Sequence, residues 1–167
     1  MPNTKQIVID TSPLISLVAA LGDLTILESL YHQVIVPFEV RQEIQRGGAN
    51  GFAVTEFEQA SFLKKWDKPI DISPFYIKLL DCGEAAVIQL ALNEKIQTVC
   101  IDEVQGRRIA RLSNLSLTGS IGILIRAKRE GYSFSMPDAI ERMKKQGIRL
   151  SERVIRVALE QTKDLAN

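Results

Sequence analysis

The sequence has few of the residues that disulfide scaffolds and histidine-based sites require. It contains two cysteines and one histidine in 167 residues. Cys82 and Cys100 do not form a C-x-x-C pair, and a secreted disulfide framework would need more cysteines, so we expect both to be buried as small hydrophobic residues. His32 is remote in sequence from the acidic motifs, which argues against a zinc site or a catalytic triad built on histidine. We expect His32 to be a surface or capping residue.

Long apolar runs and an excess of charge of one sign are also missing. Hydrophobic residues make up 46% and charged residues 25% of the chain, as in ordinary globular proteins. No run reaches membrane-spanning length, and residues 1–6 lack the zones of a signal peptide, so we expect a cytoplasmic protein without a membrane partner. The net charge of +1 provides no overall basic field, so a nucleic acid would have to be held by local basic patches.

Short runs rich in Val, Ile or Leu alternate with helical patterns along the chain, which predicts an α/β fold with a parallel sheet covered on both faces. The length suits one hydrophobic core. Residues 47–71 are either a mobile flap or a short helix with an edge segment, and we assign them no chemistry. The predicted strands comprise residues 6–10, 33–37, 97–102 and 115–118.

Four acidic residues stand at or near the ends of predicted elements, where a parallel fold brings side chains together. They are Asp10, Glu43, Glu84 and Asp102. Oxygen ligands of this kind suit Mg²⁺ or Mn²⁺. Each acid also has a structural alternative, because strand-end acids cap helices, acids favour helix N-termini, and Glu43 suits an exposed position on a helix surface. Ser120 follows the last predicted strand and either supports the acids or caps the next helix.

Several motifs, taken in order, resemble those of the PIN domain superfamily, and more narrowly of small prokaryotic PIN-like proteins related to VapC toxins. The motifs are D-T-S-P-L-I from residue 10, V-I-V-P from residue 34, Glu43, D-C-G-E-A from residue 81, and I-D-E at residues 101–103. The resemblance implies a three-layer α/β/α fold with a mainly parallel sheet of four to five strands. Residues 1–131 would form the PIN-like nuclease domain and residues 132–167 a C-terminal helical extension packed on it.

The same resemblance implies a metal-dependent nuclease, most often an endoribonuclease that uses magnesium or manganese and acts as the toxin of a toxin-antitoxin pair. The expected partners are RNA, an antitoxin protein and a second copy of the chain in a homodimer. The implied catalytic residues are Asp10, Glu43, Glu84 and Asp102, of which Asp10, Glu84 and Asp102 would hold the metal, with Ser12, Asp81, Glu103 and Ser120 as auxiliary residues.

Other interpretations stay open from the sequence. Arg107 and Arg108 either contact substrate phosphates, pair with a carboxylate or belong to a solvated helix face. The apolar positions of the C-terminal helices complete the core, pair two subunits or receive an antitoxin. The principal alternative to a nuclease is a catalytically inactive PIN-like scaffold that binds RNA or a partner protein. A phosphatase that uses Asp10 as its nucleophile is disfavoured, because Ser12 stands where a D-x-D motif needs its second acid.

Overall fold

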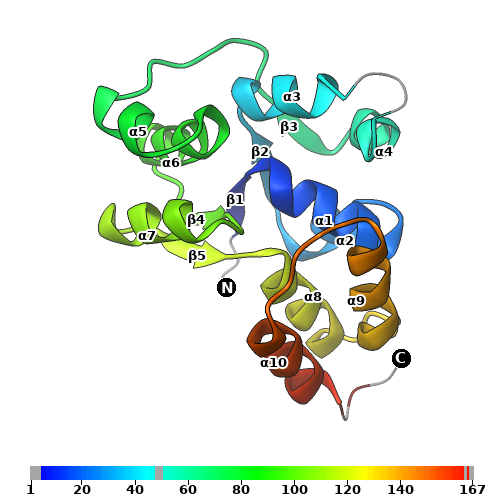
Figure 1. The fold of residues 1–167 in the computed structure, drawn as a ribbon. Helices are drawn as coiled ribbons and strands as arrows, with labels where there is room; N and C mark the ends of the chain where they lie inside the picture. Colours follow the sequence, from blue (N-terminus) through cyan, green and yellow to red (C-terminus); the bar gives the residue numbers. More distant parts are fainter. Residues whose placement is uncertain (1–4, 48–50, 164, 166–167) are drawn as a thin grey trace.

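A five-stranded, entirely parallel sheet lies at the centre of the protein in a computed structural model, which describes residues 5–47, 51–163 and 165 (Figure 1). The strand order is β3-β2-β1-β4-β5. The predicted α/β/α architecture with a parallel sheet is confirmed. The strands are β1 (Gln6–Ile9), β2 (Gln33–Val36), β3 (Leu63–Lys65), β4 (Thr98–Cys100) and β5 (Ser116–Thr118).

The central strand β1 is apolar on both faces because helices cover both sides of the sheet. Ile7, Val8 and Ile9 have no exposed surface. Such continuous apolar runs are typical of strands buried on both faces. Val8 pairs with Ile35 of β2 on one side, and Ile9 pairs with Cys100 of β4 on the other. The β1 strand therefore fixes the position of whatever follows it at the carboxyl edge of the sheet.

Helices connect successive strands and cover the sheet. Figure 1 shows α5 and α6 on one side of the sheet and α1, α8 and α9 on the other. The helices are α1 (Thr11–Leu21), α2 (Thr25–Leu30), α3 (Phe38–Gln45), α4 (Val54–Gln59), α5 (Pro74–Leu79), α6 (Cys82–Glu94), α7 (Val104–Leu112), α8 (Ser120–Arg129), α9 (Met136–Lys145) and α10 (Glu152–Thr162). None of these described helices has the length and apolarity needed to cross a membrane.

The segment 47–71 contains a short helix, α4, followed by the edge strand β3, which pairs with β2. Of the two interpretations left open by the sequence, the helix with an edge segment describes this region. Residues 48–50 lie outside the described part of the chain. Phe57 of α4 is fully buried, so this segment contributes to the core.

The C-terminal helices pack on the rest of the molecule. Helix α9 lies against α1, and α10 lies against α8 and α9. Ile140, Met143 and Ala158 are buried in the common core, whereas Val154 and Val157 on α10 remain 37% and 39% exposed. Core completion, one of the three roles considered for these helices, accounts for the buried positions and leaves part of α10 uncovered.

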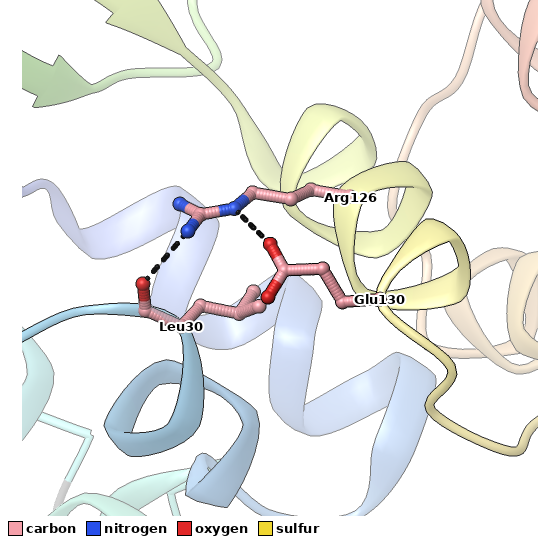
Figure 2. Close-up of polar contacts among 3 residues, drawn as sticks. All are labelled: Leu30, Arg126 and Glu130. Atoms are coloured by element: carbon pink, nitrogen blue, oxygen red, sulfur yellow. Dashed lines mark hydrogen bonds and ion pairs between the residues drawn. The ribbon is translucent and has the colours of Figure 1, made fainter. Parts of the chain in front are cut away.

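Arginine side chains from α8 and α9 fasten these helices to the N-terminal ones. In Figure 2, Arg126 donates to the carbonyl oxygen of Leu30 at 3.0 Å and to the Glu130 carboxylate at 2.6 Å. Arg142 of α9 donates in the same way to the Ala20 carbonyl at 2.8 Å. Cationic donors at the last turns of α1 and α2 satisfy carbonyls that lack a partner within the helix and complement the helix dipole.

The two cysteines occupy different environments. Cys100 of β4 is buried, as expected, but Cys82 is exposed, so the prediction that both are buried is wrong. Cys82 is the first residue of α6, and the first turn of that helix points Gly83 and Glu84 into the protein. The side chain of Cys82 is thereby left on the solvent side.

Candidate active site

The direction in which the strands are added to the sheet reverses between β1 and β4. From β1 the chain builds outward to β2 and β3, then returns to add β4 and β5 on the other side. Such a switch point leaves a crevice outside the carboxyl ends of the two strands, where open α/β sheets bind ligands. Asp10 directly follows β1, and its backbone N–H donates to the Cys100 carbonyl at 3.0 Å. Asp102 follows β4 after one residue, so both acids lie at this edge.

Asp10 is buried, with 4% of its surface exposed. It precedes α1 at the N-cap position, yet its side chain makes no capping hydrogen bond, so capping does not account for this acid. Burial raises the pKa of Asp10 well above its ordinary value, a backbone contact with Thr11 opposes the shift, and the negative charges of Asp81, Glu84 and Glu43 reinforce it. The Asp10 carboxyl group is therefore poised to bind a proton or a cation.

Glu43 of α3 is tied to the start of α1. The Thr11 hydroxyl donates to Oε1 of Glu43 at 2.5 Å, although the two residues are 32 positions apart. Glu43 is exposed on α3, and this hydrogen bond links its carboxylate to the residue that follows Asp10. Thr11 was not among the predicted site residues, although its place directly after a strand-end acid was a signal in the sequence.

Three carboxylates converge on Gly83, near the start of α6. A Cβ atom at Gly83 would lie 2.8 Å from Oε1 of Glu43, 3.1 Å from Oδ1 of Asp10 and 3.6 Å from Oδ1 of Asp81. A glycine at this position gives the oxygens room to approach. Asp81 is the N-cap of α6, because its Oδ1 accepts the backbone N–H of Glu84 at 2.8 Å.

Glu84 is buried, but its carboxylate lacks part of the hydrogen bonding that would offset the cost of burial. It is 5% exposed, and its Oε2 atom has no hydrogen-bond partner among the described residues. The same oxygen lies against Gly106 of α7, where a Cβ would collide with it. Burial and the negative charge of Asp81 raise the pKa of Glu84 to about 7. We refer to Asp10, Glu43, Asp81 and Glu84 together as the Gly83 cluster.

Asp102 has partners for both carboxylate oxygens. Its Oδ1 accepts the backbone N–H of Ser120 at 2.8 Å, and its Oδ2 accepts the Ser120 hydroxyl at 2.9 Å. Burial raises the pKa of Asp102, whereas the two hydrogen bonds from Ser120 and the charge of Arg107 oppose that shift. The N-cap of α8 is Gly119, so Ser120 does not cap its own helix, and Asp102 serves the first turn of α8 instead. We call this arrangement the Asp102–Ser120 pair.

The remaining predicted residues surround this pair. Arg107 is half-buried and donates to the carbonyls of Ile101 at 2.8 Å and Thr118 at 3.3 Å, so it braces the ends of β4 and β5. Arg108 and Glu103 are exposed. A cleft of roughly 1050 Å³ lies beside the pair, and its lining includes Ser12, Asp102, Glu103, Arg107 and Ser120.

The profile of the family DUF3368, described as a PIN domain, matches residues 6–164, which is most of the chain. The chain belongs to this PIN domain family. No curated protein matches it. PIN domains are generally nucleases, so the family membership indicates a nuclease-type scaffold that acts on nucleic acids.

Nucleases with PIN domains generally use divalent metal ions, and the donors here suit that chemistry. The candidate ligands offer carboxylate oxygen only, which hard cations prefer, and one buried oxygen of Glu84 lacks a partner. As they stand, no three His, Cys, Asp or Glu side chains of the described residues are grouped closely enough to hold an ion. The residues of this PIN domain therefore fit a divalent ion chemically, and their side chains would have to draw together around it.

Proposed function

We propose that this PIN domain is an Mg²⁺- or Mn²⁺-dependent endoribonuclease that hydrolyses RNA phosphodiester bonds. The observation that carries the proposal is Glu84, a buried carboxylate with an unpartnered oxygen and a pKa raised to about 7, beside the other acids of the Gly83 cluster. Asp10 and Glu84 are buried, whereas Glu43 and Asp81 are exposed. Burial of carboxylates close to other negative charges opposes folding unless a cation or protons neutralise them. Strongly shifted groups of this kind are characteristic of functional sites.

Each acid has a distinct role in the proposal. Asp10, Glu84 and Asp102 hold the metal, which when bound lowers the pKa of water and stabilises charge on the phosphate. Glu43 orients the attacking water or accepts its proton, with its carboxylate held by the Thr11 hydroxyl. Ser120 keeps Asp102 in place through its two hydrogen bonds.

The test is cleavage of single-stranded and structured RNAs by the purified protein in Mg²⁺, in Mn²⁺ and in EDTA. Wild type should cleave only with metal, Asp10→Asn should not cleave, and Asp67→Asn should behave like wild type because Asp67 is an exposed acid outside the Gly83 cluster. Folded wild-type protein that cleaves none of the RNAs in either metal would overturn the proposal. The alternative, an inactive scaffold that binds RNA or a partner protein, would then stand.

The resemblance of the motifs to VapC-like proteins supports a finer proposal: a cytoplasmic toxin paired with an antitoxin protein. Induced expression of the wild type should then arrest growth, whereas Asp10→Asn should not. Growth arrest by both proteins would contradict a role for nuclease activity in toxicity.

Exposed apolar residues on α5 support a further part of the proposal, a homodimer. Phe75, Ile77 and Leu79 are 59%, 57% and 40% exposed. Phe75 and Leu79 are four residues apart and lie on the same face of α5, and apolar side chains exposed together are typical of protein interfaces. Light scattering should give twice the chain mass for wild type and the chain mass for Phe75→Glu, and a monomeric wild type would contradict the dimer.

A further inference from the structure

The cleft beside the Asp102–Ser120 pair is built from two parts of the chain that are distant in sequence. One wall contains Ser12 of α1, Asp102 and the first turns of α7 and α8, and the other consists of residues 147–151 and the start of α10. Figure 1 shows α10 beside α8, where the C-terminal helices close off this side of the molecule. The volume of roughly 1050 Å³ lies just above the range of about 300–1,000 Å³ that is typical of small-molecule sites.

The C-terminal wall presents two cations that have no anionic partner in the described part of the chain. Arg149 and Arg153 are exposed and line the cleft. Over the described residues, neither guanidinium forms a hydrogen bond or ion pair, whereas Arg107 on the opposite wall is engaged by two carbonyls. A guanidinium offers planar, bidentate hydrogen bonding that matches a phosphate group.

The distribution of charge within the cleft favours a chain of phosphates. Asp102, one of the three proposed metal ligands, and Glu103 lie on one wall, and the two arginines that have no partner among the described residues lie on the other. The first turns of α7, α8 and α10 reach the cleft as well, and their backbone dipoles favour negative charge. A ligand with several phosphates in a row can contact the arginines of one wall and, at the same time, the proposed cation at the other.

The apolar part of the lining is aliphatic. Its larger members are Ile15, Leu117, Ile121, Ile125, Ile148, Leu150, Val154 and Val157. No described residue of the lining is aromatic, so the cleft lacks the stacking platforms that read unpaired bases. Recognition would rest on phosphate contacts, which position a nucleic acid without reading its sequence.

We propose that this cleft binds a single-stranded segment of RNA through its phosphates, with Arg149 and Arg153 as the phosphate-binding residues. The proposal rests on the proposed endoribonuclease function and assigns its substrate channel to the C-terminal extension. A single strand enters between the two walls, whereas a duplex would have to dock across both. Affinity depends on salt and varies little with sequence.

The test is fluorescence anisotropy with a labelled oligouridine strand and with a labelled RNA duplex, in Mg²⁺, at several KCl concentrations. All proteins carry Asp10→Asn to suppress cleavage. Adding Arg149→Gln and Arg153→Gln should weaken binding of the single strand by about tenfold or more. The slope of log K against log salt should fall by about 1.4, since each contact to a single strand contributes about 0.7.

Arg156→Gln is the matched control. Arg156 lies on the same helix with the same charge, but it faces a separate hollow with Lys144 and Glu160 and should leave the slope unchanged. Equal binding by the double variant and the Arg156 control, tighter binding of the duplex, or no binding of the single strand would overturn the proposal. Because binding is measured without cleavage, loss of binding in the double variant would support the channel even if the wild-type protein proved inactive.

Discussion

The Gly83 cluster and the Asp102–Ser120 pair lie at the same edge of the sheet, but their carboxylates differ in hydrogen-bond partners and in the charges around them. Both oxygens of Asp102 accept hydrogen bonds from Ser120. In the cluster, Oε2 of Glu84 has no partner within the described structure, and Asp10 faces three other negative groups. Burial raises the pKa of Asp10, Glu84 and Asp102. A backbone hydrogen bond opposes this shift at each of the three acids, and at Asp102 the Ser120 hydroxyl and the charge of Arg107 oppose it as well.

This difference separates two uses of a buried acid. A carboxylate with satisfied hydrogen bonds holds structural elements together, here the end of β4 and the start of α8. A carboxylate that is buried among like charges weakens the folded state until something neutralises it. Replacing the acid with its uncharged amide should therefore lower stability at Asp102 and raise it in the Gly83 cluster.

The largest effect is expected for Asp10→Asn. We expect metal-dependent cleavage to fall by about 100-fold or more, equivalent to about 3 kcal/mol, through loss of a metal ligand. The free energy of unfolding in EDTA should increase, because the amide removes one charge from the Gly83 cluster. Urea titration and the cleavage assay measure the two quantities on the same preparation.

Asp102→Asn makes the same chemical change in the Asp102–Ser120 pair and is compared with Asp10→Asn. Cleavage should again fall, but stability should fall as well, since one amide oxygen replaces two acceptors for the N–H and hydroxyl of Ser120. If both substitutions lowered stability by the same amount, the distinction between the two places would be wrong.

The second prediction concerns pH and Glu84. Its pKa is about 7 in the folded protein against 4.5 ordinarily, so the folded state binds more protons between these values. Stability without metal should therefore fall as the pH rises from 4.5 to 7, by on the order of 1–3 kcal/mol. Glu84→Gln should flatten this dependence in urea titrations across that range.

Glu94→Gln is the control for this prediction, because Glu94 is exposed at the other end of α6. It should keep the wild-type slope. Saturating Mn²⁺ should raise the melting temperature of wild type most above pH 7, where Glu84 is ionised. A slope that Glu84→Gln leaves unchanged would mean that another group titrates in this range.

The sheet was largely predictable because its central strands are short, uninterrupted apolar runs between turn signals. The exception is β3, where Leu63 is buried and the two residues after it are lysines, a pattern typical of a protected edge. It pairs with β2, which is distant in sequence, so no local periodicity revealed it.

The acids of the site were visible in the sequence, but their surroundings were not. Strand ends point to Asp10 and Asp102, whereas the bond between Thr11 and Glu43 depends on α3 packing beside α1. The bonds from Ser120 likewise depend on β4 and β5 being neighbours. Which carboxylate has partners and which has none is thus a property of long-range packing.

The third prediction uses two glycines as a matched pair. In Gly83→Ala, the new Cβ meets the ends of the Glu43 and Asp10 side chains, which can move, and alanine favours the helix by up to about 1 kcal/mol. Stability should stay equal or increase while cleavage falls, because the carboxylates are displaced.

Gly119→Ala should behave differently. Its Cβ would lie 2.7 Å from Oδ1 of Asp102, the atom that accepts the Ser120 N–H. Moving that oxygen leaves the first turn of α8 without its acceptor and should lower the free energy of unfolding by about 1–2 kcal/mol. Equal stability of the two alanine variants in urea would contradict the contrast.

The smallest effect is expected for Ser120→Ala. This substitution removes the hydroxyl that donates to Oδ2 of Asp102 and leaves the backbone N–H in place, so we expect a loss of about 1 kcal/mol. The pKa of Asp102 should rise further, because one of the hydrogen bonds that hold it down is gone. Ser61→Ala, at an exposed position, should leave stability unchanged. If Ser120→Ala matched that control in urea titrations, the hydroxyl would contribute nothing to the pair, and the charge of Arg107 would remain as the feature that distinguishes Asp102 from the Gly83 cluster.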